Sequence, residues 1–200
     1  MIGYTEDGRE VMSELTELLS SFGPTRGDDV DWGVVETVYG RILPSDYRRF
    51  VAAFGSGSIE QALYVYAPAT TTAELAGNVV STLPAGMLAS ESADSWVDPA
   101  QAGLYRLEDM LLWGWTEQDF LCWIISGEEP DCWPVAVYSR FRAAWSVYPF
   151  GMAEFLSRLL RDEFDEWPIS DAGLRTVSQP WFLHDKDEET GWDLQERPRE

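Results

Sequence analysis

Residues 110–149, with the sequence MLLWGWTEQDFLCWIISGEEPDCWPVAVYSRFRAAWSVYP, decide the fold. This stretch is rich in aromatic and β-branched residues, and turn-forming residues interrupt it repeatedly. The pattern predicts an antiparallel meander of four strands at 111–115, 120–126, 134–139 and 143–148, joined by turns at 116–119, 127–133 and 140–142. The alternation along these strands predicts one covered sheet face and one wetter face.

A closing helix is predicted directly after the meander, because apolar residues recur there at helical spacing. They are Met152, Phe155, Leu156, Leu159 and Leu160. Their common stripe is suited to cover one face of the sheet. Beyond this helix the chain becomes polar and mostly acidic. We therefore predict a domain over residues 1–166 and an acidic C-terminal extension over residues 167–200, in which Trp181, Phe182 and Trp192 are available as anchors.

The residues before the meander predict three helices, at 10–22, 31–39 and 44–55, from their apolar spacing. Asp31 is placed to cap the second helix, and Gly55 is placed to end the third. A strand is predicted at 59–67, a further helix at 70–84 and a loop at 86–103. The expected fold class is therefore α+β, with an antiparallel or mixed sheet covered by N-terminal and C-terminal helices.

The composition limits the classes of partner. Of the 200 residues, 45% are hydrophobic and 14% aromatic, which predicts a folded core rather than disorder. The chain has 35 acidic and 14 basic residues, a formal net charge of −21. Because this charge repels phosphate backbones and anionic lipids, we expect neither a nucleic acid nor a membrane as partner.

The first residues, MIGYTEDG, lack the basic and apolar regions of a secretory signal. No apolar run approaches the ~18 residues of a membrane span. We therefore expect a cytoplasmic protein. The two cysteines, Cys122 and Cys132, are then expected to be free thiols in a reducing compartment, with a disulfide between them as the alternative.

Residues that would indicate catalysis are sparse. The single histidine, His184, stands in the acidic tail, where we expect it to be solvated, and one imidazole does not supply a zinc site or a serine–histidine relay. The run Gly55-Ser56-Gly57-Ser58 lacks the lysine of a phosphate loop and the third glycine of a dinucleotide fingerprint. No cofactor or metal is predicted. An acid–base pair of carboxylates is neither located nor excluded, since such residues are plentiful.

Acidic residues cluster in two predicted turns of the meander. Glu117 and Asp119 lie in the first, and Glu128, Glu129 and Asp131 precede Trp133 in the second. Successive turns of a meander lie at opposite ends of the sheet, so the two clusters need not form one patch. They are interpreted either as solubilising turn formers or as docking residues for a basic partner, with Trp133 as the apolar anchor. A calcium loop is a third interpretation, but the expected ligand pattern is missing.

A family resemblance follows from residues outside the meander as well as within it. Trp32, followed by LPSDYRRF at 43–50 and FGSG at 54–57, resembles the N-terminal signature of the SUKH superfamily, also called SMI1/KNR4. The segments 111–115, 120–123, 131–135 and 155–156 are similar to the family's sheet and closing helix in the same order. The resemblance covers residues 10–164. Residues 84–109 match loosely, and nothing after residue 165 matches.

The resemblance implies a non-enzymatic α+β domain. Bacterial members of this family are mostly immunity proteins that neutralise toxins of polymorphic or contact-dependent systems, and fungal relatives are regulatory hubs of cell-wall signalling. The resemblance therefore implies an immunity protein that binds a cognate basic toxin, with a nuclease as one candidate. The alternative is an intracellular scaffold or regulatory module without a toxin partner.

Overall fold

The meander predicted at 110–149 forms one end of a mixed sheet. The computed structural model describes residues 4–88, 94–127 and 129–196, and within these ranges the sheet has nine strands. The meander consists of β5 (Met110–Trp115), β6 (Asp119–Ile124), β7 (Val135–Ser139) and β8 (Ala144–Tyr148). All neighbouring pairs in it are antiparallel, so the predicted meander is confirmed.

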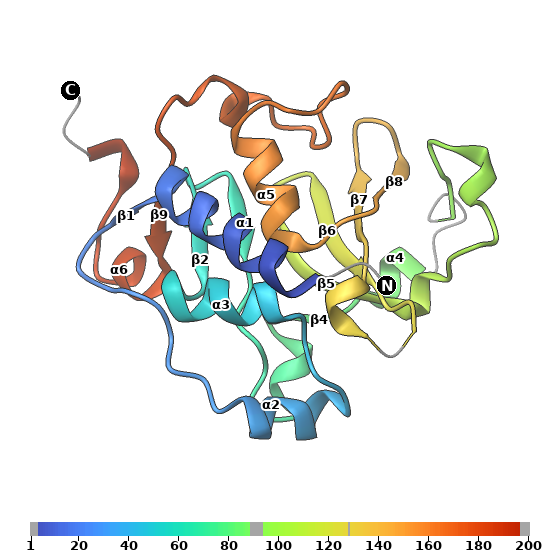
Figure 1. The fold of residues 1–200 in the computed structure, drawn as a ribbon, viewed down its shortest axis with the longest axis horizontal. Helices are drawn as coiled ribbons and strands as arrows, with labels where there is room; N and C mark the ends of the chain where they lie inside the picture. Colours follow the sequence, from blue (N-terminus) through green and yellow to red (C-terminus); the bar gives the residue numbers. More distant parts are fainter. Residues whose placement is uncertain (1–3, 89–93, 128, 197–200) are drawn as a thin grey trace.

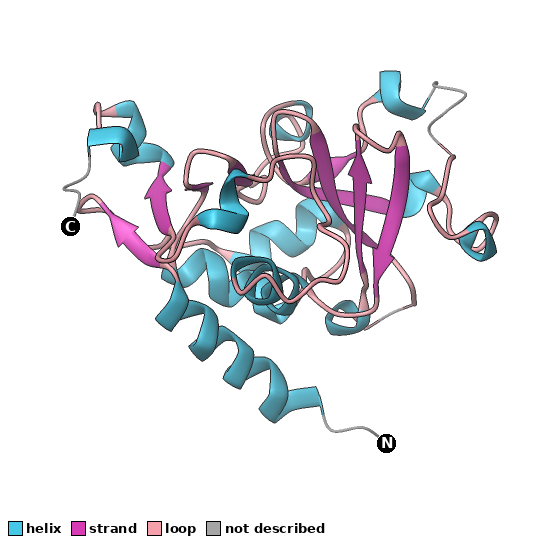
Figure 2. Ribbon diagram, turned by 90° about the horizontal axis from the view of Figure 1, so that it is seen from above, coloured by secondary structure: helices cyan, strands magenta, loops and turns pink. Residues whose placement is uncertain are grey.

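The other end of the sheet is built from short strands. They are β1 (Ser20–Phe22), β2 (Gly57–Ile59), β3 (Leu63–Val65) and β9 (Trp181–His184), and the strand order is β1-β9-β2-β3-β5-β6-β7-β8. The β1–β9 pair is parallel, whereas β9 pairs with β2 in antiparallel fashion. A further strand, β4 (Ser81–Thr82), pairs with β5 beside this path. Figure 2 shows the meander and the β1–β9 pair at opposite ends of the molecule.

The position of β9 corrects the predicted course of the tail. Strand β9 lies between β1 and β2, and its Phe182 and Leu183 are buried. The sheet therefore extends past residue 166, where the sequence pattern ended the domain. The short helix α6 (Asp185–Glu189) follows β9 directly. His184 is also buried, 2% exposed, and is not the solvated residue that the acidic surroundings predicted.

Three helices cover one face of the sheet. Helices α1 (Tyr4–Leu18), α3 (Ser45–Ala53) and α5 (Met152–Leu160) lie together in front of the strands in Figure 1. Their apolar stripes enclose the larger core with Trp113 and Trp123 of the sheet, whose ring centroids are 5.9 Å apart. The predicted closing helix is confirmed as α5, with Phe155 fully buried.

The opposite face carries a smaller core. It contains Met110, Leu112, Trp145 and Trp96, and is partly covered by the segment that includes α4 (Ala85–Leu88). Helix α2 (Trp32–Tyr39) lies at the bottom of Figure 1 and contributes the buried Val35 to the larger core. Its predicted N-cap is confirmed, because the Asp31 side chain accepts hydrogen bonds from the N–H groups of Gly33 and Val34.

Three predicted elements differ in the structure. Residues 20–22 form strand β1 instead of the end of a helix, because β9 offers a partner for them. The strand predicted at 59–67 is a hairpin of β2 and β3, with Glu60 and Gln61 at its turn, both at φ +53°.

The third element that differs is the helix predicted at 70–84. Only a single 3-10 turn, Glu74–Ala76, forms there, because Gly77 leaves the helical conformation and the Val80 N–H donates a hydrogen bond to the Ala67 carbonyl. The loop expected over 86–103 contains part of α4 and the 3-10 turn Pro99–Gln101, while residues 89–93 lie outside the described ranges.

Candidate functional site

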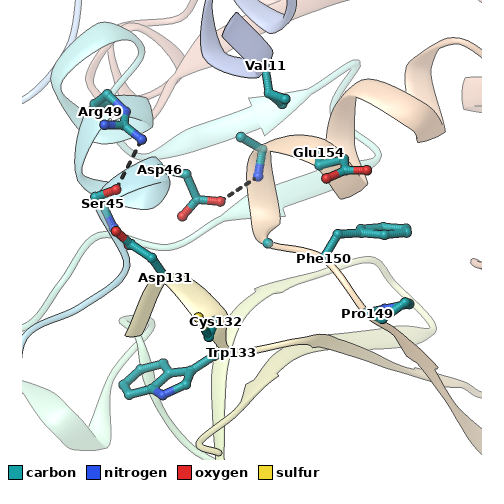
Figure 3. A pocket seen from close by; sticks show the side chains of 12 residues that line it. Val11, Ser45, Asp46, Arg49, Asp131, Cys132, Trp133, Pro149, Phe150 and Glu154 are labelled. Carbon is teal, nitrogen blue, oxygen red and sulfur yellow. Dashed lines mark hydrogen bonds between the residues drawn. The ribbon is translucent and has the colours of Figure 1, made fainter. Parts of the chain in front are cut away.

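A pocket of about 260 Å³ lies where the N-terminal ends of α3 and α5 meet the connection between β6 and β7. Val11 of α1 and Phe150 before α5 give it apolar walls, and Asp46, Arg49, Asp131 and Glu154 give it polar ones. Figure 3 shows these side chains around one space. We call it the interhelix pocket.

Asp131 holds the start of α3. Pro44 occupies the N-cap position and supplies no side-chain acceptor for the free N–H groups of the first turn. The Asp131 Oδ1 atom accepts a hydrogen bond of 2.6 Å from the Ser45 N–H instead. A carboxylate beside a helix N-terminus is also favoured by the helix dipole. An exposed residue of the β6–β7 connection thereby fixes the rim of the interhelix pocket.

Asp46 performs the same task for α5. The N-cap residue of α5, Gly151, has no side chain to cap the helix, and Asp46 Oδ2 accepts a hydrogen bond of 2.9 Å from the Ala153 N–H. A Cβ atom on Gly151 would lie 2.7 Å from that oxygen, so only glycine permits this approach. Burial raises the pKa of the Asp46 carboxyl, against the lowering effect of the N–H groups of Ala153 and Tyr47.

Charge in the interhelix pocket is mainly negative. Among the described residues, three carboxylates and one guanidinium line it. The Arg49 guanidinium donates to the Ser45 hydroxyl at 3.0 Å, and Glu154 forms an ion pair of 2.6 Å with Arg158. The Arg158 guanidinium also lies 4.8 Å from the centre of the Phe150 ring. A cationic side chain with an aliphatic stem matches this combination of apolar wall and carboxylate rim.

The predicted docking residues of the second turn divide between surface and core. Glu129 and Asp131 are exposed, Asp131 at the rim of the interhelix pocket and Glu129 in the same connection. Trp133 is buried, 2% exposed, and belongs to the larger core, so it is not the surface anchor that its acidic neighbours predicted. Figure 3 shows its ring directed away from Phe150 and Glu154. Glu128 lies outside the described residues.

The first turn lies at the other end of β6 and does not join this group. Glu117 is exposed there. Asp119 is 1% exposed, and its carboxylate accepts hydrogen bonds from the Arg140 N–H, the Ser170 N–H and the Thr116 hydroxyl. Asp119 therefore ties the tail to the sheet and is closed to a partner in this structure.

Sequence reasoning missed three residues of the pocket, Asp46, Arg49 and Glu154. Asp46 lies in the first turn of its own helix, α3, and nothing in the local pattern relates it to α5. One available signal was Gly151, which starts α5 without a capping side chain and so requires an acceptor from elsewhere. Which residue supplies that acceptor depends on tertiary packing.

The described residues contain neither a metal-binding cluster nor a membrane-spanning helix. No group of three or more His, Cys, Asp or Glu residues in that part of the chain is arranged to hold a metal ion. None of the helices within residues 4–88, 94–127 and 129–196 has the length and apolar character needed to cross a bilayer.

Comparisons with protein families, with curated proteins and with solved structures find no match to this chain. The resemblance to the SUKH superfamily therefore stays a prediction from the residues that carry it.

Proposed function

We propose that the chain is a non-enzymatic, cytoplasmic immunity protein of the SUKH type that binds and occludes a basic toxin. The observation that carries the proposal is the interhelix pocket, with Asp131 and Glu154 in its lining and Glu129 in the adjacent connection, on a chain of net charge −21. Long-range attraction brings a basic partner to such a surface, and the apolar walls then contribute short-range contact.

The pocket is suited to one anchor side chain of that partner. An arginine or lysine entering it lays its methylene stem along Val11 and Phe150 and places its charge near the Asp131 carboxylate. The Asp131 Oδ1 atom already accepts from the Ser45 N–H, which holds the carboxylate in position before the partner arrives. Preorganisation of this kind lowers the cost of binding. Stoichiometric occlusion follows, without a chemical step.

A rescue assay tests the proposal. Cells expressing each toxin-domain gene encoded beside this chain's gene are supplied with the wild-type chain or with the double variant Glu129→Gln/Asp131→Asn. We expect the wild type to restore growth against one toxin and the double variant to restore it less well. The amide that replaces the Asp131 carboxylate still offers an oxygen to the Ser45 N–H, so the variant removes charge while keeping a helix cap.

The matched control removes two exposed carboxylates elsewhere, in the variant Glu17→Gln/Glu36→Gln on α1 and α2. It should rescue like the wild type, and thermal melts should show that all three chains fold. Failure of the wild type against every neighbouring toxin contradicts the proposal and favours the scaffold alternative. Equal rescue by the two double variants would show that the toxin does not dock at the interhelix pocket.

A further inference from the structure

Five aromatic side chains form one continuous row across the sheet. Tyr64 of β3 pairs directly with Trp115 of β5, which pairs in turn with Phe120 of β6. Phe120 pairs with Tyr138 of β7, which pairs with Trp145 of β8. Directly paired residues project from the same face of a sheet. We call these five residues the aromatic row; they lie on the face opposite to α1, α3 and α5.

Exposure changes along the aromatic row. Trp145 is fully buried in the smaller core, and Phe120 and Tyr138 are half-buried against it. At the other end, Tyr64 and Trp115 are half-buried, belong to neither core, and stack with their ring centroids 5.2 Å apart and their planes at 30°. Packing within the sheet explains the buried end of the row. The same packing does not explain why the solvent-facing parts of the Tyr64 and Trp115 rings are aromatic.

Carboxylates from separate segments lie near this half-buried pair. Glu117 is exposed in the turn that follows Trp115, and Glu188 of α6 is held by a hydrogen bond of 2.9 Å from the Gln61 amide. Burial raises the pKa of the Tyr64 hydroxyl, and the charges of Glu188, Glu117 and Asp185 raise it further. The single lysine of the chain, Lys186, directs its ammonium to Asp28 at 2.6 Å.

Aromatic faces and carboxylates together favour a cation. The face of an indole or phenol ring is electronegative and attracts guanidinium or ammonium groups. Arginine fits best, because its planar group can lie on the rings while its N–H fork reaches a carboxylate. Phosphate-bearing ligands are repelled by the same carboxylates.

We propose that the Tyr64–Trp115 end of the aromatic row binds an arginine of an extended segment in a basic protein partner. The inference rests on the proposed function for the identity of that partner, but the surface is distinct from the interhelix pocket. Glu117 is at the opposite end of β6 from Asp131, and the aromatic row and the interhelix pocket lie on opposite sides of the sheet, so a single partner that engages both must reach around its edge. Two separated contacts increase avidity without enlarging either one.

A peptide titration tests this surface directly. The probe is a blocked peptide of alternating arginine and glycine, and its matched control carries citrulline, which keeps the shape of arginine and removes its charge. Indole N–H resonances are followed by NMR. We expect the arginine peptide to shift the Trp115 indole, and the citrulline peptide to bind more weakly. Trp115→Leu and Glu117→Gln should each weaken arginine binding about 3- to 30-fold.

Two controls separate this surface from the rest of the molecule. Trp192→Leu removes another tryptophan that is 42% exposed, and it should leave the peptide affinity unchanged. Glu129→Gln/Asp131→Asn alters the interhelix pocket, and it should leave the shift of Trp115 unchanged even if rescue of toxin-expressing cells is lost. Glu117 is exposed, so Glu117→Gln remains informative if Trp115→Leu fails to fold.

Several outcomes overturn the inference. Equal binding of the arginine and citrulline peptides removes the role of charge, and peptide binding that leaves the Trp115 resonance unmoved places the site elsewhere. A neutral oligosaccharide that shifts Trp115 at least as strongly as the arginine peptide assigns the surface to sugar stacking instead. Because this titration uses no toxin, its failure is distinguishable from failure of the rescue assay.

Discussion

At the scale of single residues, Phe50 tests the core between α3 and the sheet. It is fully buried, and its ring centroid lies 5.0 Å from that of Phe54 and 5.6 Å from that of Phe182. Phe50→Ala should lower the free energy of unfolding by about 3–5 kcal/mol, since it leaves a cavity in a packed core. Urea denaturation measures this. Phe141→Ala removes a ring that is 87% exposed and is the control; equal losses in the two variants would contradict the packing described here.

Asp28 links the turn after α3 to the C-terminal segment. Its carboxylate accepts hydrogen bonds from the Lys186 ammonium at 2.6 Å and the Ser56 N–H at 3.0 Å, and it faces His184 Nε2 at 3.4 Å. Burial alone would raise the pKa of Asp28, but Lys186, Ser56 and His184 together hold it below its ordinary value of 3.8.

The lowered pKa of Asp28 sets the sign of a pH effect. A carboxyl whose pKa is depressed by folding stabilises the protein above its unfolded pKa, and that stability is lost as pH falls through the folded pKa. Asp28→Asn should therefore lower the free energy of unfolding by about 1–3 kcal/mol at pH 7. The difference from wild type should shrink as pH falls below about 4. Denaturant melts between pH 7 and pH 3 measure it, and a difference that grows in acid would refute the assignment.

The two cysteines should differ in reactivity. Cys122 is buried and Cys132 is exposed, and both are free thiols. Burial raises the pKa of the Cys122 thiol well above its ordinary value, which disfavours the reactive thiolate. Alkylation of the native protein should label Cys132 alone, and alkylation after unfolding should label both. Mass spectrometry that finds a linked pair would contradict this.

At the scale of elements, Asp119 connects the β5–β6 turn to the tail. Asp119→Ala removes the acceptor of the Arg140 and Ser170 N–H groups and should lower the free energy of unfolding by about 2–5 kcal/mol. It should also expose the segment near Ser170 to proteolysis. Glu117→Ala, in the same turn but exposed, should change stability by no more than about 0.5 kcal/mol. Comparable effects of the two substitutions would remove the structural role of Asp119.

Elements whose pattern is local were predictable. The meander strands, α2, α3 and α5 carry apolar periodicity together with turn or capping residues, and each is found within a few residues of its expected place. The short elements β1, β2 and β9 were not predictable in this way. They exist because they pair with one another across the chain, from residue 20 to residue 184, and nothing within three or four residues signals a partner so distant.

The candidate site was predictable in part for the same reason. Exposed carboxylates at Glu129 and Asp131 follow from turn composition. Composition could not distinguish Asp119, which is buried, from Glu117, which is exposed two residues earlier. The prediction for Trp133 was wrong because an aromatic residue beside acidic ones suits an interface as well as a core, and only its burial in the larger core decides between them.

At the scale of the whole molecule, net charge is the property on which the proposed function depends. The two exposed acidic regions, at Glu117 and at Glu129 with Asp131, lie at opposite ends of β6. In the proposed function, the field of a net charge of −21 attracts a basic partner before contact, and either region then supplies short-range binding. Steering of this kind raises association rates roughly 10- to 1,000-fold and weakens as salt screens the charges.

The measurement that tests the proposed steering most directly is the salt dependence of association, followed by stopped-flow mixing of the chain with a toxin that the rescue assay identifies. The association rate should fall steeply between about 0.05 M and 1 M salt, as the Debye length shrinks from more than ~10 Å to ~3 Å, while the dissociation rate changes less. Glu129→Gln/Asp131→Asn should slow association at low salt, and Glu17→Gln/Glu36→Gln should slow it less. An association rate that is independent of salt would contradict the account.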